Sequence, residues 1–252
     1  MVKNQTKSPD AGKRRALTAV DRPSANFDSR GGAPIDILLF HYTGMASGSA
    51  ALARLCDERA RVSSHYLVEE DGRVFRLVDE DARAWHAGVA CWAGETNINA
   101  RSIGIEIVNP GHEFGYRDFP DAQVGAVIDL ARGILARHSI PSHRVLAHSD
   151  VAPQRKSDPG ERFPWGRLAA AGIGWWPEAL CGRSPEFRPA ADGFLSHLEA
   201  IGYDVARLEG SAAAIRAFQR HFHPLAIGSR AEGHPDEATA AVAAALAKLC
   251  GA

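Results

Sequence analysis

The apolar residues in the first two-thirds of the chain follow strand and helix spacings in turn. Residues 35–44, IDILLFHYTG, form a nearly continuous apolar run, which is typical of a strand buried on both faces. Residues 65–78 hold two apolar stretches around Asp71-Gly72, a dipeptide that suits a tight turn, so this segment predicts a β-hairpin. Residues 121–140 carry apolar positions at helical spacing and predict an amphipathic helix.

Other segments extend this alternation of strands and helices. Ser47 and Ser49 precede an apolar stretch and favour a capped helix. Residues 102–109, SIGIEIVN, alternate strictly, so that the isoleucines share one face of a strand and Ser102, Gly104 and Glu106 share the other. Elements mixed in this order predict an α/β domain over residues 25–175, with a mixed central sheet flanked by helices.

The rest of the chain divides into three parts outside that domain. Residues 1–24 are polar and basic, as in a flexible tail, and residues 176–189 read as a Pro- and Gly-containing linker. Residues 190–252 predict a small three-helix domain. Its helices are expected at 191–202, 211–222 and 236–249, around a shared core of Phe194, Leu198, Ile201, Ile215, Phe218 and Phe222.

Composition and charge exclude several classes of protein. The 252 residues include 29 Lys and Arg against 30 Asp and Glu, for a formal net charge of -1. Because this balance creates no strong positive field, nucleic acid is not an expected partner. No apolar run approaches the roughly 20 residues that cross a bilayer. The short apolar stretch after Arg14-Arg15 falls below the length of an export signal.

The cysteines bear on the compartment. All 4 are scattered and none forms a CxxC pair, which favours free thiols in a reducing environment. The expected location is therefore the cytoplasm, with the periplasm or cell envelope as the alternative.

Two histidines and an aspartate suggest a metal centre. His41 and His148 each stand where a predicted strand meets a loop, and Asp158 follows in a loop stiffened by Pro159. Two imidazoles and a carboxylate are a ligand set for one catalytic zinc ion, with water as the fourth ligand. The spacing alone leaves another interpretation open, namely two ordinary buried histidines and a turn aspartate.

Two charged residues could complete a catalytic site. Glu106 lies in the middle of an apolar strand, where a carboxylate is costly to bury unless it is paired or functional, and Gly104 beside it would leave room for a ligand. Such a group could transfer protons during hydrolysis. Lys156 could stabilise a developing oxyanion. The alternatives are a solvated strand face for Glu106 and a surface position for Lys156.

Six ordered motifs over about residues 35–170 resemble the zinc-dependent N-acetylmuramoyl-L-alanine amidases of the amidase-2 family. They are FHYTG, SSHYLVEEDGRVFRLV, AWHAG, NINARSIGIEIVN, VLAHSDVAP and RKSDPG. The segment AIRAFQRHFHP, residues 214–224, is similar to the three-helix peptidoglycan-binding module of the AmiD-like subgroup.

The resemblance implies a role for each candidate. It makes His41, His148 and Asp158 the zinc ligands, Glu106 the catalytic acid/base and Lys156 the cation that stabilises the tetrahedral intermediate. It further implies a set of substrate contacts in the groove: His65, Trp85, His86, Asn97 and Arg101.

The implied reaction is hydrolysis of the amide that joins N-acetylmuramic acid to L-alanine, in peptidoglycan or in anhydro-muropeptides. The missing export signal favours recycling of soluble fragments, whereas the C-terminal helices favour polymeric wall. A third alternative is a peptidoglycan-binding protein without catalysis.

Overall fold

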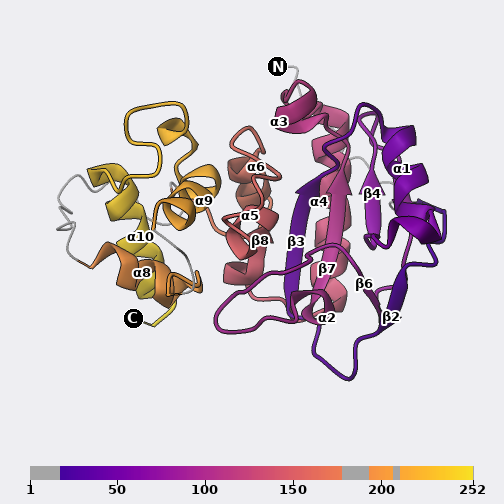
Figure 1. Cartoon of the computed structure of the whole chain (residues 1–252), viewed down its shortest axis with the longest axis horizontal. Helices are drawn as coiled ribbons and strands as arrows, with labels where there is room; N and C mark the ends of the chain where they lie inside the picture. The colour runs from indigo at the N-terminus through magenta and orange to yellow at the C-terminus, as the bar shows by residue number, and fades with distance from the viewer. Residues whose placement is uncertain (1–17, 178–192, 207–210, 252) are drawn as a thin grey trace, which may run out of the picture.

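The computed structural model describes residues 18–177, 193–206 and 211–251 (Figure 1). A six-stranded sheet in the order β1-β5-β4-β7-β3-β8 forms its centre, parallel throughout except for the antiparallel pair β4–β5. The strands are β1 Ala19–Asp21, β3 Ile37–Tyr42, β4 Tyr66–Val68, β5 Val74–Arg76, β7 Ser102–Ile107 and β8 Val145–Ala147. Strands β2 (Phe27–Ser29) and β6 (Ala82–Ala84) form a separate antiparallel pair.

Helices flank the sheet, which confirms the predicted fold class. The α-helices are α1 Gly48–Cys56, α2 Ile98–Arg101, α3 Gly111–Phe114, α4 Asp121–Arg137, α5 His148–Val151, α6 Trp165–Ala170, α8 Phe194–Ile201, α9 Ala212–Phe222 and α10 Glu237–Leu249. Short 3-10 turns are present at Glu58–Ala60, Ser142–Arg144 and Pro224–Ala226. In the described part of the chain, no helix is both long enough and apolar enough to cross a membrane.

The period-two pattern of the central strands decides which side chains face α4. Ile103, Ile105 and Ile107 of β7 pack with Leu38 and Phe40 of β3 in a cluster that includes the buried side of α4. Alternation places the next residues of each strand on the opposite face. His41 follows Ile37 and Leu39 on that second face, at the carboxyl end of β3.

The prediction of a flexible tail through residue 24 is wrong for residues 18–24. β1 pairs in parallel with β5, and Asp21 accepts a 2.8 Å hydrogen bond from Nε of Arg76. The backbone N–H groups of Arg22 and Ser24 donate to the carbonyls of Arg76 and Leu77 at 2.9 and 2.8 Å. Edge pairing of this kind uses backbone groups, so the side-chain pattern of a polar segment does not reveal it.

The three predicted C-terminal helices are present, and the six residues predicted for their core are buried. Their core is not separate, because one hydrophobic cluster joins Leu198 and Phe218 to Leu39 of β3 and to Trp92. Figure 1 shows α8, α9 and α10 at one end of the molecule, on the side where α5 and β8 lie. The predicted linker lies almost entirely outside the described residues.

Candidate metal centre and active site

Three buried side chains converge at the carboxyl ends of β3 and β8. His41 ends the apolar part of β3, His148 begins α5 directly after β8, and Asp158 lies in the following loop. The Nδ1 atoms of His41 and His148 lie 2.9 Å apart, and Asp158 Oδ2 lies 3.2 Å from the first and 3.0 Å from the second. In the described part of the chain, they form the one group of His, Cys, Asp or Glu side chains placed to hold a metal ion.

These donor atoms fit a metal ion. Tetrahedral zinc bonds of about 2.0–2.1 Å separate neighbouring ligand atoms by about 3.3–3.4 Å, close to the observed distances. His148 Nε2 lies 3.0 Å from the Ala87 carbonyl oxygen and must carry the proton of that hydrogen bond. In the neutral ring, Nδ1 then presents a lone pair toward a second imidazole and a carboxylate. A cation at the point of convergence would stabilise this arrangement.

Residues 86 and 87 orient both histidine ligands. His86 Nδ1 lies 3.0 Å from His41 Nε2, while the Ala87 carbonyl accepts from His148. Partners on the second ring nitrogen set the tautomer and orientation of a ligand histidine. The His86 ring in turn rests on Gly104, where a Cβ atom would come within 2.6 Å of Cγ and Nδ1. Gly104 therefore makes room for His86, whereas the sequence had suggested room for a ligand.

The protonation states suit metal binding. Burial lowers the pKa of His41 to about 4, so its ring is neutral near pH 7. For Asp158, burial would raise the pKa, but the neighbouring His148 and His41 outweigh it and hold that pKa well below its usual value. The site therefore offers a neutral imidazole on His41 and a carboxylate on Asp158.

Glu106 stands beside this centre. It pairs in register with His41 across the parallel strands β7 and β3, so both side chains project from the same face. Burial raises the pKa of Glu106 well above its usual value, the charge of Asp158 raises it further, and Lys156 opposes them. Its Oε2 is buried and has no hydrogen-bond partner among the described residues.

A cleft of about 820 Å³ opens over these groups. Its lining includes Glu106, His148, Lys156 and Asp158, the residues to which the sequence assigned metal binding and catalysis, and also His86. The structure therefore brings four of the predicted catalytic and ligand residues to one cavity, with half-buried Lys156 on the loop that carries Asp158. His41 does not line the cleft, but its Nδ1 contacts the two ligand candidates that do.

Most of the predicted substrate contacts lie elsewhere. His65 is fully buried, where its Nδ1 accepts the Gly104 N–H at 2.9 Å and its Nε2 lies 2.8 Å from Arg30 Nη2. Because the ring is enclosed by the fold, a direct contact with substrate is excluded and His65 supports the strand beneath His86. Burial is also the main reason that the pKa of His65 falls to about 3.

Asn97 and Arg101 belong to the opposite end of β7. Arg101 forms ion pairs with Asp36 and, at 3.2 Å, with Glu95, and it precedes the first residue of the strand. Asn97 precedes α2 and is exposed. Neither residue lines the cleft, because Glu106 stands near the other end of the same strand. Their roles as substrate contacts stay predictions, and the structure places both residues outside the cleft.

Trp85 and His86 differ although they are neighbours. His86 reaches the cleft, as predicted, whereas Trp85 is half-buried with the Arg61 guanidinium 5.4 Å from its ring centre, and it does not line the cavity. Sequence reasoning missed Arg155, whose Nη2 and Nε donate at 3.1 Å to the carbonyls of Ala87 and Val89. The one sequence feature that could have pointed to Arg155 is its position next to Lys156, the basic residue that was predicted to act in the site.

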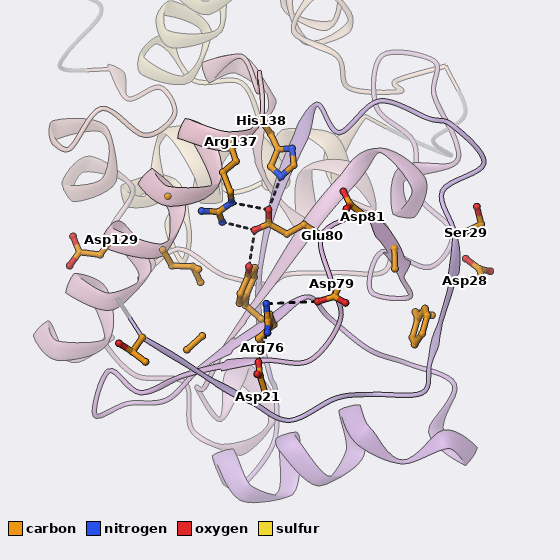
Figure 2. A pocket seen from close by; sticks show the side chains of 17 residues that line it. Asp21, Asp28, Ser29, Arg76, Asp79, Glu80, Asp81, Asp129, Arg137 and His138 are labelled. Carbon is orange, nitrogen blue, oxygen red and sulfur yellow. Dashed lines mark hydrogen bonds and ion pairs between the residues drawn. The ribbon is translucent and has the colours of Figure 1, made fainter. Parts of the chain in front are cut away.

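A larger cavity of about 1280 Å³ lies at the edge of the sheet formed by β1 (Figure 2). Its central group is Glu80, which accepts hydrogen bonds from Arg137 and Tyr66 at 2.6 and 2.7 Å, with His138 also at 2.7 Å. Burial would raise the pKa of Glu80, but these partners outweigh it and lower the pKa to about 2. The cluster ties the end of α4 to the loop before β6 and lacks the ligand set found in the cleft.

Three side chains that could hold a metal ion, next to a carboxyl group of raised pKa, form the kind of centre that metal hydrolases use. Residues 31–161 match the Amidase_2 family, described as N-acetylmuramoyl-L-alanine amidase, and the chain belongs to that family. The matched range contains every residue of the centre and Glu106.

Individual relatives extend the similarity beyond that range. The chain is 40% identical over 238 residues to the N-acetylmuramoyl-L-alanine amidase AmiD of Escherichia coli, covering 86% of this chain and 84% of AmiD. It is 38% identical over 112 residues to the 1,6-anhydro-N-acetylmuramyl-L-alanine amidase AmpD of Haemophilus influenzae, covering 44% of this chain and 59% of AmpD.

Solved structures agree in fold. AmiD of E. coli in complex with the substrate anhydro-N-acetylmuramic acid-L-Ala-D-gamma-Glu-L-Lys superposes with a TM-score of 0.74 at 38% identity, covering 90% of this chain and 93% of that one. AmpDh3 of Pseudomonas aeruginosa in complex with anhydromuramic pentapeptide gives a TM-score of 0.74 at 33% identity, covering 90% and 95%. The C-terminal helices are thus part of a fold shared over most of each chain.

Proposed function

We propose that this protein hydrolyses the amide bond between the lactyl group of N-acetylmuramic acid and the L-alanine of the stem peptide, with one zinc ion per chain. The observation that carries the proposal is the convergence of His41, His148 and Asp158 on one point, next to a cleft that is lined by Glu106 and Lys156. A metal-independent binding protein would have no need of a buried carboxyl group in that position.

The same five residues divide the chemistry between them. His41, His148 and Asp158 would hold the zinc ion, which when bound polarises the amide carbonyl and lowers the pKa of water. Glu106 would take a proton from the attacking water, because its raised pKa makes the carboxylate a stronger base than an exposed glutamate. The same carboxyl group would then protonate the leaving amine of L-alanine.

Lys156 would act on the carbonyl oxygen. Negative charge develops on that oxygen as water adds, and an ammonium group in the cleft stabilises it more than it stabilises the neutral substrate. The products are a muramic acid carboxylate and a free peptide amine, so water supplies all the atoms that are added.

The substrate class follows from the relatives. AmiD and AmpDh3 were solved with anhydromuramic peptides, and AmpD is named for the anhydro sugar. We therefore propose soluble anhydro-muropeptides as the substrate and recycling in the cytoplasm as the role. The free thiols of Cys56 and Cys250 support a reducing compartment.

Product analysis by mass spectrometry tests these statements. The zinc-loaded protein would receive anhydro-muropeptide and intact peptidoglycan in parallel, with EDTA-treated protein and Glu106→Gln as controls. We expect metal-dependent release of stem peptide from the soluble substrate and none with Glu106→Gln. Release from intact wall alone would replace recycling by wall hydrolysis. Binding without release from either substrate would leave a peptidoglycan-binding protein.

A further inference from the structure

The helix that carries His148 is too short to place itself. α5 spans four residues, His148–Val151, and a single helical turn has little stability of its own. Its third residue, Asp150, is 1% exposed, and Oδ2 accepts the backbone N–H of Ala147 at 2.8 Å, across the start of the helix. The position of the metal ligand therefore depends on what holds Asp150.

The other hydrogen bonds to Asp150 come from the C-terminal helices. The hydroxyl of Tyr203, just after α8, donates to Oδ1 at 2.7 Å, and Nδ1 of His221 in α9 lies 2.7 Å from Oδ2. Both side chains are buried, with 2% and 1% exposure. Burial and the neighbouring carboxylate raise the pKa of Tyr203 well above its usual value, so the phenol stays protonated and donates.

The surroundings of His221 hold its ring in one orientation. It stacks on Trp165, with centroids 3.7 Å apart, and on Phe222 at 3.8 Å. Its Nε2 is buried and has no hydrogen-bond partner among the described residues. Within that part of the chain, the ring therefore forms its side-chain hydrogen bond through Nδ1, to Asp150. A ring fixed in this way can act as a rigid donor to the carboxylate.

We propose that the C-terminal helices act as a positioning element for the metal centre, with Tyr203 and His221 holding His148 in place through Asp150. A buried carboxylate that loses donors must reach water or move, because leaving it unsatisfied is costly. Movement of Asp150 would carry α5 with it and displace His148 Nδ1, which lies 3.0 Å from Asp158 Oδ2. This inference rests on the metal centre of the proposed function and adds a role that differs from binding of the cell wall.

The affinity for Zn²⁺, measured by competition with a chelating dye, tests this inference. Tyr203→Phe removes only the hydroxyl, and His221→Phe keeps a stacking ring without the donor. Both should weaken zinc binding about tenfold or more, as loss of the groups that orient metal ligands does. His221→Asn keeps an N–H donor near the position of Nδ1 and should bind zinc within about threefold of the unchanged protein.

Gln219 provides a matched control on the same helix. It is fully buried, and its Nε2 donates at 2.9 Å to the carbonyls of Ala231 and His234, within the C-terminal segment and away from Asp150. Gln219→Leu should lower the melting temperature but leave zinc affinity unchanged at a temperature where all variants are folded by circular dichroism. A second readout is the visible spectrum of the Co²⁺-substituted protein, which should change in Tyr203→Phe and His221→Phe only.

The outcomes separate the two proposals. Absence of tight zinc binding by the unchanged protein would overturn the proposed function itself. Tight binding that is equal in the unchanged protein, Tyr203→Phe and His221→Phe would overturn only the positioning role. Equal weakening by Gln219→Leu would also overturn it, because general loosening of the C-terminal helices would then explain the effect.

Discussion

Gly104→Ala should disturb the metal centre without touching a ligand. The added Cβ would lie 2.6 Å from Cγ and Nδ1 of His86 and 2.8 Å from Cδ2. Carbon atoms in contact lie about 3.5–4.0 Å apart, so the ring must move by about 1 Å. That displacement is enough to break the 3.0 Å contact between His86 Nδ1 and His41 Nε2.

The size of the effect follows from two contributions. Overpacking at a buried site costs about 1–3 kcal/mol, which for a chain of this size lowers the melting temperature by about 2–4 °C per kcal/mol. Loss of a group that orients a metal ligand weakens metal binding about 10–100-fold, which equals about 1.4–2.7 kcal/mol. The activity at limiting zinc should fall in the same proportion and recover partly when zinc is added in excess.

Chelator competition for zinc, a melting curve and steady-state kinetics measure these effects. Gly125→Ala is the matched control, because its Cβ would meet nothing within 4 Å, and it should bind zinc normally and be as stable as the unchanged protein or slightly more so. Unchanged zinc affinity in Gly104→Ala would refute the reasoning. A rise in KM alone would instead show that Gly104 makes room for substrate, as the sequence had suggested.

Other variants and conditions test the remaining roles. Glu106→Gln should lower kcat by about 10²–10⁴-fold with zinc affinity retained, and normal turnover by this variant would exclude Glu106 as the acid/base. Because the pKa of Glu106 is raised and its carboxylate is the base, kcat/KM should fall with decreasing pH at values well above the usual glutamate pKa, an acid limb that a pH–rate profile would show. Lys156→Met should lower kcat by about 10²–10³-fold with little change in zinc affinity, whereas a change confined to KM would assign it to substrate binding. Removal of zinc by EDTA should lower the melting temperature, since a ligand at about 1,000 times its Kd contributes about 4 kcal/mol, and an unchanged melting curve would argue against a bound metal.

The local pattern of the chain was enough to predict the main elements and to single out candidate site residues, whose roles came from the family resemblance. The apolar run of β3, the strict alternation of β7 and the helical spacing of α4 each reflect one buried face, which the sequence encodes directly. His41, His148 and Asp158 stand at strand ends and in a stiff loop, and a carboxyl group at Glu106 conflicts with its apolar neighbours. These positions, and the conflict at Glu106, can be recognised without knowledge of the fold.

Only the tertiary structure decided which residues support the site, because their roles depend on contacts between distant segments. Asp150 meets partners 53 and 71 residues away, and no local pattern distinguishes it from a helix-capping aspartate. His65 and Arg101 are polar residues near family motifs, yet burial removes the first from the cleft and the direction of β7 places the second at its far end. Sequence therefore determined the elements and the candidate site residues. The packing of strand faces and C-terminal helices determined which other side chains orient those candidates.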